Sequence, residues 1–155
     1  MSLFLLIALI GGCGFHLQSA VTAPAEMDRT YVDAVDKHSL FYRRLRRNLT
    51  AVGVEIVDSP ADATATLSIL SDVTGQRVLS VSARNVPTEY EVYYTIQYAL
   101  VAGERYLLET QQLTITRDYT YDETLVLGKA QEEQLLRDAI VDDLARIVMK
   151  QISTL

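Results

Sequence analysis

A strict alternation of apolar and polar side chains between Tyr90 and Leu100 constrains the fold more than any other stretch of this chain. The even positions are apolar or aromatic: Tyr90, Val92, Tyr94, Ile96, Tyr98 and Leu100. The odd positions include Glu89, Glu91, Thr95 and Gln97. Successive side chains of a strand point to opposite faces, so this pattern predicts a half-buried antiparallel strand. Another layer must cover its apolar face.

Two segments repeat apolar residues at the helical period and supply that layer. The first has Phe41, Leu45, Leu49 and Val52 at spacings of four and three. Ser39 is expected to cap this helix at its start, and Gly53 to follow its end in a left-handed conformation. The second predicted helix runs from about residue 130 to 152. Its apolar stripe consists of Leu136, Ile140, Leu144, Ile147 and Val148.

Further strands are predicted over residues 30–35, 54–57, 67–81 and 106–119. In the third of these, five apolar residues have odd numbers and would lie on one face of the strand: Leu67, Ile69, Val73, Leu79 and Val81. Gly75 is expected to mark a bulge or bend in it. In the last strand Leu108 and Leu113 have opposite parities, which predicts a bulge between them. The turns fall at residues 83–87 and 102–104.

These elements predict an α+β fold. We expect a two-layer sandwich, with two amphipathic helices on one face of a mostly antiparallel mixed sheet of four or five strands. Residues 29–155 form one domain in this interpretation, and residues 13–28 form a lipid anchor and tether.

The N-terminal segment resembles a bacterial lipoprotein signal. An apolar run from Leu3 to Ile10 leads into Gly11, Gly12 and Cys13. The run is too short to span a bilayer as a helix but suits a signal peptide over residues 1–12. The Cys13 thiol would accept a diacylglyceryl group and become the new N-terminus. The alternative is a short buried element with an incidental cysteine.

Cysteine content and charge narrow the function further. Cys13 is the only cysteine, so no intramolecular disulfide is possible, and acylation would consume the lone thiol. The formal net charge is −6. This charge argues against a nucleic-acid partner, which requires a basic face. It also argues against a peripheral protein held to anionic lipid by charge, so we expect a covalent anchor.

No catalytic or metal-binding motif emerges, and we expect no enzyme activity and no cofactor. His16 and His38 have no cysteine or carboxylate at metal-ligand spacing. The chain contains neither a phosphate-binding glycine loop nor a nucleophile elbow. Asp142 and Asp143 are neighbours on a predicted helix and therefore point in different directions, so a solvated face explains them better than a catalytic pair.

Two groups of basic residues are candidates for binding. Arg43, Arg44, Arg46 and Arg47 crowd the first predicted helix. They form either a solvated face or a docking patch for an acidic partner surface. Separately, strand topology places Arg84, in a hairpin turn, and Lys129, in a predicted loop, at the same end of the sheet. Two cations converging there suit a phosphorylated ligand.

Several stretches resemble the lipopolysaccharide-assembly lipoprotein family LptE, also called rare lipoprotein B. The resemblance begins with Cys13-Gly14-Phe15-His16-Leu17 and continues through residues 45–49 and 53–56. It persists at Arg84-Asn85, residues 88–90, residues 126–129 and the final helix. One departure is Gln18, where many relatives carry arginine.

The resemblance implies a role in lipopolysaccharide transport. Members of that family plug the outer-membrane β-barrel LptD, aid its assembly and bind lipopolysaccharide. It implies lipopolysaccharide contact at Arg84 and Lys129, and a lipid-anchored location on the periplasmic face of the outer membrane and in the barrel lumen. Gly14 after the cysteine, rather than aspartate, agrees with the outer membrane. The alternative is a stand-alone periplasm-facing lipoprotein that binds a soluble ligand without a barrel partner.

Overall fold

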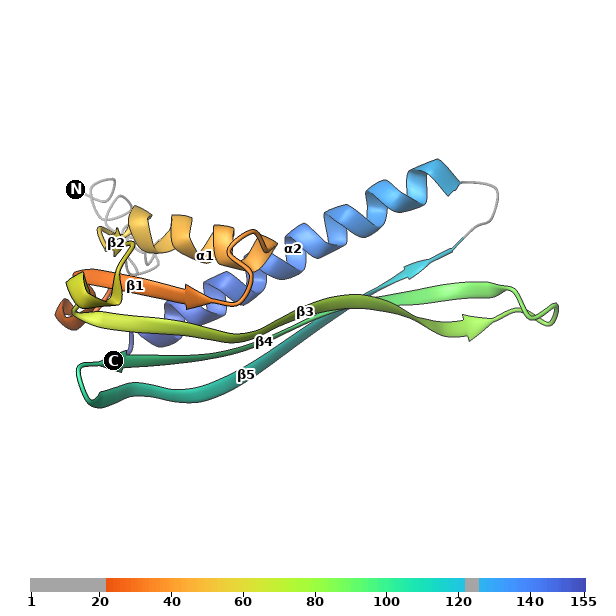
Figure 1. Ribbon diagram of the computed structural model, residues 1–155. Helices are drawn as coiled ribbons and strands as arrows, with labels where there is room; N and C mark the ends of the chain where they lie inside the picture. Colours follow the sequence, from red (N-terminus) through yellow and green to blue (C-terminus); the bar gives the residue numbers. More distant parts are fainter. Residues whose placement is uncertain (1–21, 122–125) are drawn as a thin grey trace, which may run out of the picture.

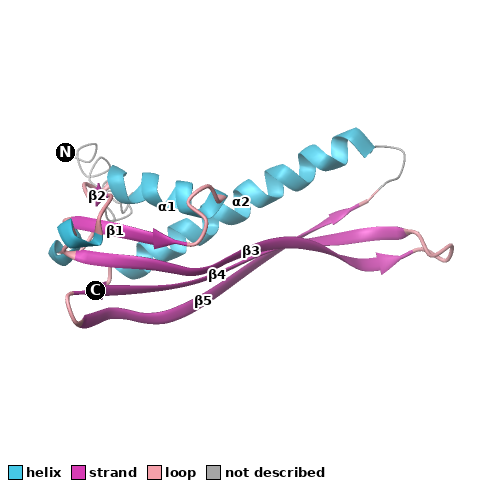
Figure 2. Ribbon diagram, in the orientation of Figure 1, coloured by secondary structure: helices cyan, strands magenta, loops and turns pink. Residues whose placement is uncertain are grey.

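Two helices lie on one face of a five-stranded mixed sheet (Figures 1 and 2). The computed structural model describes residues 22–121 and 126–155. The strands are β1 (Arg29–Ala34), β2 (Glu55–Val57), β3 (Ala65–Val81), β4 (Pro87–Ala102) and β5 (Arg105–Thr120). The helices are α1 (Leu40–Ala51) and α2 (Val126–Ile152), with short 3-10 turns at Ala25–Met27 and Pro60–Asp62.

The strand order is β2-β1-β3-β4-β5. β1 pairs in parallel with both β2 and β3, while β3, β4 and β5 form an antiparallel meander. The short strands β1 and β2 reach only one end of the sheet, so the other end consists of the three long strands alone (Figure 1). The predicted α+β two-layer sandwich is confirmed, with five strands.

Helix α1 forms where the sequence predicted it. The Ser39 hydroxyl accepts a 3.0 Å hydrogen bond from the Tyr42 N–H and caps the first turn. The buried side chains are Phe41, Tyr42, Leu45 and Leu49. Gly53 follows the helix with a φ of +93°, a conformation that strains other residues. Local sequence therefore sets both ends of this helix.

The alternation in β4 is confirmed in full. Its core-facing side chains are Val92, Tyr94, Ile96, Tyr98 and Leu100, each at most 2% exposed. The Tyr98 hydroxyl donates to Gln151 of α2, and burial raises its pKa to about 12. Met27, just ahead of β1, is also fully buried in this core.

The prediction that the odd-numbered apolar residues of β3 lie on one face is wrong beyond Ile69. Ile69 pairs with Tyr98, but Asp72 pairs with Ile96, so one extra residue, Leu70, interrupts the register. A bulge reverses which side chains face the core. Val73 therefore lies on the outer face and is 50% exposed, and Asp72 takes the inward position.

Gly75 is not the site of a bulge. It pairs in register with Tyr93, and a second register shift falls between Val78 and Ser80. A Cβ atom at residue 75 would lie 2.5 Å from the Tyr93 hydroxyl oxygen. A side chain at residue 75 would therefore push the Tyr93 ring away from this position.

The bulge predicted in β5 is confirmed. Leu108 pairs with Leu100 and Gln111 with Tyr98, so two residues of β5 oppose Ala99 alone. After the bulge Leu113 and Ile115 pair with core-facing residues of β4. Because of the extra residue, even-numbered Leu108 and odd-numbered Leu113 and Ile115 all pair with core-facing residues of β4.

Helix α2 begins at Val126 rather than near residue 130. Its fully or nearly fully buried residues are Ile140, Val141, Leu144, Ala145, Val148, Met149 and Ile152. All of them lie in its second half, and the helix rises away from the sheet toward its N-terminal end (Figure 1). None of the helices in the described part of the chain combines the length and apolar content that a membrane span needs.

Candidate functional site

The turn between β3 and β4 presents Arg84 at the far end of the long strands. The Asn85 N–H donates to Ser82 O at 2.9 Å, and the Ser82 N–H donates to Val86 O at 2.7 Å. Asn85 has a φ of +63°, which asparagine tolerates better than most residues. Arg84 is exposed in this turn, as the sequence predicted.

Lys129 lies in the first turns of α2 and not in a loop, which corrects the prediction. Gly128 is a poor helix former, so the helical pattern in the sequence starts after it and the predicted start of the helix is too late. The side chains of residues 122–129 lie outside the described part of the structure.

The start of α2 and the β3–β4 turn lie toward the same end of the molecule, in separate layers (Figure 1). The Tyr121 N–H donates to Thr88 O at 2.8 Å, so β5 also reaches this end before the chain enters α2. The contact between Arg84 and Lys129 stays a prediction.

The outer face of the sheet carries a polar ladder. The Gln97 amide donates to Gln112 Oε1 at 2.7 Å, and the Thr95 and Thr114 hydroxyls are 2.9 Å apart. Glu91, expected to face outward, does so but is only 12% exposed because Arg77 lies 2.5 Å from it. The helices leave this face uncovered (Figure 2).

The second half of β3 is an exposed apolar edge. β1 pairs with β3 only as far as Ile69, so no described strand covers the edge from residue 70 to 81. Five aliphatic side chains there are about half exposed: Leu70, Val73, Val78, Leu79 and Val81. We call these five residues the β3 edge. Proteins normally shield such edges, since unpaired strands invite other chains to pair.

A polar cluster that the sequence did not predict lies between this part of the sheet and α2. The Arg137 guanidinium donates to Thr74 Oγ1 at 2.8 Å and to Glu133 Oε1 at 3.1 Å. The Tyr119 hydroxyl donates to Gln76 Oε1 at 3.0 Å, and burial raises its pKa. The bulge at residue 70 turns Thr74 and Gln76 inward, which is why no parity argument could find this cluster.

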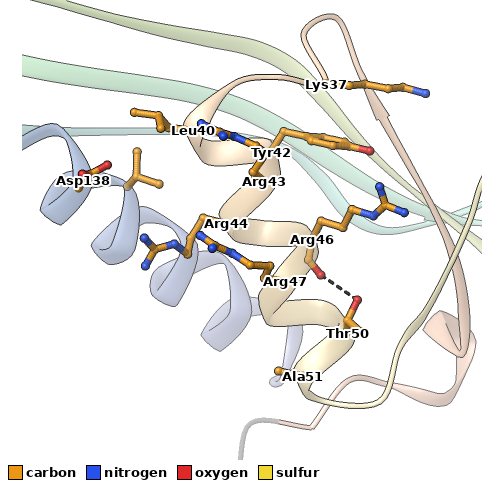
Figure 3. A pocket seen from close by; sticks show the side chains of 11 residues that line it. Lys37, Leu40, Tyr42, Arg43, Arg44, Arg46, Arg47, Thr50, Ala51 and Asp138 are labelled. Carbon is orange, nitrogen blue, oxygen red and sulfur yellow. Dashed lines mark hydrogen bonds between the residues drawn. The ribbon is translucent and has the colours of Figure 1, made fainter. Parts of the chain in front are cut away.

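Basic side chains surround an open groove of about 750 Å³ along α1 (Figure 3). The cations are Lys37, Arg43, Arg44, Arg46 and Arg47, which we call the α1 basic patch. Arg44 forms an ion pair with Asp142 of α2. Arg43, Arg46 and Arg47 are exposed and have no ion pair with any described carboxylate. The structure thus adds Lys37 to the cluster that the sequence indicated.

Asp142 and Asp143 belong to separate ion pairs. Asp142 faces Arg44 on α1, whereas Asp143 accepts a 2.6 Å hydrogen bond from Arg117 on β5 and also pairs with Arg146. The Arg117 hydrogen bond holds the pKa of Asp143 below its usual range. These carboxylates join elements of the fold and do not form a catalytic pair.

No three His, Cys, Asp or Glu side chains within residues 22–121 and 126–155 gather closely enough to bind a metal ion. His38 lies exposed in the turn before α1, where its backbone N–H donates to Asp36 Oδ1 at 2.7 Å. Cys13, His16 and Gln18 fall outside the described residues. The candidate sites described above are three surfaces: the β3–β4 turn, the β3 edge and the α1 basic patch.

A family match decides how these surfaces are interpreted. Residues 27–152 match the family LptE, described as lipopolysaccharide-assembly. The chain belongs to the LptE family. The LPS-assembly lipoprotein LptE of Pectobacterium atrosepticum is 26% identical over 97% of this chain and 82% of its own length. That of Yersinia enterocolitica is 26% identical over 96% of this chain and 72% of its own.

Solved structures agree with the fold of this LptE-family chain. A minor lipoprotein from Acinetobacter baumannii is 26% identical with a TM-score of 0.67, over 83% of this chain and 92% of that one. Lipoprotein B from Nitrosomonas europaea is 23% identical with a TM-score of 0.75, over 90% of each chain. Rare lipoprotein B from Shewanella oneidensis has a TM-score of 0.70 at 23% identity, over 81% of this chain and 94% of that one.

Membership of the LptE family confirms three predictions made from the sequence. The chain is an LPS-assembly lipoprotein, it is not an enzyme, and the resemblance to rare lipoprotein B is real. Lipoprotein relatives place it among lipid-anchored proteins of the cell envelope.

Proposed function

We propose that this LptE-family protein is anchored through Cys13 to the periplasmic face of the outer membrane and plugs the lumen of the LptD β-barrel. In this position it aids barrel assembly and binds lipopolysaccharide through Arg84 and Lys129. Family membership supplies the LPS-assembly role, and the surfaces described above support the partner and the ligand.

The β3 edge is the observation that carries the barrel partner. Its five aliphatic side chains are between 46% and 52% exposed, on the part of β3 whose edge opposite β4 is paired with no strand of the described chain. Exposed apolar residues on an open edge favour a protein partner that covers them. The polar ladder on the outer face suits the polar interior of a membrane barrel.

The alternative, a stand-alone carrier of a soluble ligand, receives less support. A carrier requires a concave, mostly apolar pocket that buries most of its ligand. The groove along α1 is open to solvent and rimmed by cations instead. A stand-alone protein would also leave the β3 edge uncovered.

Arg84 and Lys129 suit the phosphates of lipopolysaccharide. Guanidinium and ammonium groups form strong, charge-assisted hydrogen bonds with phosphate oxygens. Lys129 is the fourth residue of α2, and the N-terminal turn of a helix favours negative charge. Both positions lie toward the end of the molecule formed by the long strands (Figure 1).

Co-purification tests the barrel partner. We expect the tagged full chain, extracted from membranes in mild detergent, to carry LptD in equal amount. Replacing Val73 and Val81 with lysine should reduce the recovered LptD at least tenfold, because the β3 edge becomes charged. Tyr106→Lys is the control, since Tyr106 is 63% exposed on β5, at the opposite edge of the sheet. Recovery of the wild-type chain alone would favour the stand-alone carrier.

Titration with lipopolysaccharide tests the ligand site. Hydrogen bonds to charged groups contribute about 1.5–3 kcal/mol each, so Arg84→Glu/Lys129→Glu should weaken binding at least tenfold. Arg29→Glu/Lys150→Glu makes the same change of charge at two exposed residues elsewhere and should bind as the wild type does. Equal affinity of both variants would move the site away from Arg84 and Lys129.

Processing tests the anchor. We expect Cys13→Ala to remain an uncleaved precursor, because the thiol that accepts the diacylglyceryl group is gone. Labelling with a radioactive or clickable fatty acid should mark the wild type and not the variant. Normal processing and acylation of Cys13→Ala would disprove the assignment.

A further inference from the structure

The α1 basic patch is a concentration of positive charge in an acidic protein. Four of the 14 Lys and Arg residues of the chain fall within residues 43–47, whereas the formal net charge is −6. Asp138 is the one carboxylate among the residues that line the groove, and it also accepts a 3.4 Å hydrogen bond from Gln134. Arg44 is matched by Asp142. The remaining cations of the patch outnumber the carboxylates that face them.

Three of these cations are free to bind an external anion. Arg46 and Arg47 form no ion pair with a described carboxylate, and Arg43 uses its Nε only for a long, 3.4 Å hydrogen bond to Ser39 O. Residues three and four apart share a face of a helix, so Arg43 is a neighbour of both Arg46 and Arg47. Guanidinium groups bind phosphate oxygens with two parallel hydrogen bonds.

The cations spread across a surface instead of converging on one point. Arg44 and Arg47 extend toward α2, whereas Arg46 and Lys37 extend on the other side of α1 (Figure 3). Leu40, Ala51 and Val141 add apolar area to the groove between them. A row of phosphate groups with apolar neighbours fits this arrangement better than a single small anion does.

The end of α1 lies at the end of the molecule where the described chain begins. After α1, the Glu55 N–H donates to Asp28 O at 2.9 Å, which fixes the helix exit beside the start of β1. Eight residues lie between Cys13 and Thr22, so the Cα atoms of these two residues can be at most about 32 Å apart. An acyl chain on Cys13 would therefore hold the end of the domain where α1 stops near a bilayer.

We propose that the α1 basic patch binds the phosphate headgroups of an anionic phospholipid surface and orients the anchored protein on it. The orienting role rests on the anchor at Cys13 proposed above, whereas binding by the patch does not. Acylation would provide the attachment, and the patch would select which face of the domain meets the lipid.

Vesicle binding by the full chain tests this proposal. The chain carries Cys13→Ala, so that no acyl group contributes, and the apolar N-terminal segment is the same in every sample. We expect tighter binding to vesicles of equal phosphatidylcholine and phosphatidylglycerol than to phosphatidylcholine alone. Arg43→Gln/Arg46→Gln/Arg47→Gln should reduce binding to the mixed vesicles at least about thirtyfold, given the attraction of anionic surfaces for each cation.

The substitutions leave the fold intact for clear reasons. All three arginines are exposed, glutamine has a similar helix propensity, and the Arg44–Asp142 pair is kept. Circular dichroism should give the same melting temperature for variant and parent. Arg29→Gln/Arg105→Gln/Lys150→Gln is the matched control, which removes three positive charges from other exposed positions and should bind the mixed vesicles as the parent does.

Four outcomes would overturn the proposal. The first is equal binding to both kinds of vesicle, and the second is unchanged binding by the triple glutamine variant. The third is full displacement from mixed vesicles by millimolar inorganic phosphate, which would mark a site for the free anion. The fourth is tighter binding to a polyglutamate peptide than to the vesicles, which would mark an acidic protein partner.

Discussion

The hydroxyl of Tyr94 donates a 2.6 Å hydrogen bond to Asp72 Oδ1 from the neighbouring strand. The two side chains share the inner face of the sheet only because Leu70 interrupts the register of β3. Burial, followed by the neighbouring carboxylate, raises the pKa of Tyr94 well above its usual value. Asp72 Oδ2 is buried and has no hydrogen-bond partner in the described structure, so the carboxylate relies on the hydrogen bond from Tyr94 to Oδ1.

Tyr94→Phe should lower the free energy of unfolding by about 1–3 kcal/mol, because it removes a partner from a buried carboxylate. Urea denaturation of the full chain measures the change. Tyr106→Phe is the control, since Tyr106 is 63% exposed, and it should stay within about 0.5 kcal/mol of the wild type. Equal stability of wild type and Tyr94→Phe would mean that the hydrogen bond is absent in solution.

Leu144→Asp should cost more than about 4 kcal/mol, since it places an unpaired charge at a position with 0% exposure. That loss approaches the whole stability of a typical domain. Leu135→Asp introduces the same substitution in the same helix, where the side chain is 62% exposed, and should be nearly neutral. Similar melting temperatures for the two variants would show that the buried face of α2 is assigned wrongly.

Asp143 should contribute stability that depends on pH. Its hydrogen bond from Arg117 lowers its pKa in the folded state, so the unfolded chain binds the proton more readily. The contribution, about 0.5–1 kcal/mol for a partly exposed pair, is complete at neutral pH. It disappears as the pH falls below about 4, where aspartate in the unfolded chain is protonated.

Comparing Asp143→Asn with the wild type in urea at several pH values measures this difference. The gap between them should be largest near pH 7 and close as the solution is acidified. Asp118→Asn serves as the control, because Asp118 is exposed and forms no ion pair with a described residue. A gap that persists undiminished at pH 2 would contradict the role assigned to the charge.

Gly75→Ala should destabilise the wild type by about 1–3 kcal/mol, because the new methyl group would overlap the Tyr93 ring. In a Tyr93→Thr background the same change should stabilise the chain by about 0.5–1 kcal/mol, since alanine costs less backbone entropy than glycine. Thermal unfolding of the four chains gives the coupling between the two residues. A stabilising Gly75→Ala in the wild type would show that the ring is not held against Gly75.

The sequence predicted those elements whose signals are local. Helix α1 has its cap at Ser39, its stripe and its terminal glycine within 15 consecutive residues, and β4 has an uninterrupted alternation. The same holds for the bulge in β5, where a change of parity within one strand is itself the signal. The arginines of α1 were visible as a cluster for the same reason.

Only the tertiary structure decided the positions that depend on register. One extra residue at Leu70 moved Val73 to the outer face and brought Asp72, Thr74 and Gln76 inward, and no parity within β3 alone reveals such an insertion. The exposure of the β3 edge likewise follows from where β1 stops pairing, at Ile69. Local sequence determines each element by its own periodicity and caps. The faces that meet, and the edges left open, are set by pairing between strands distant in the chain.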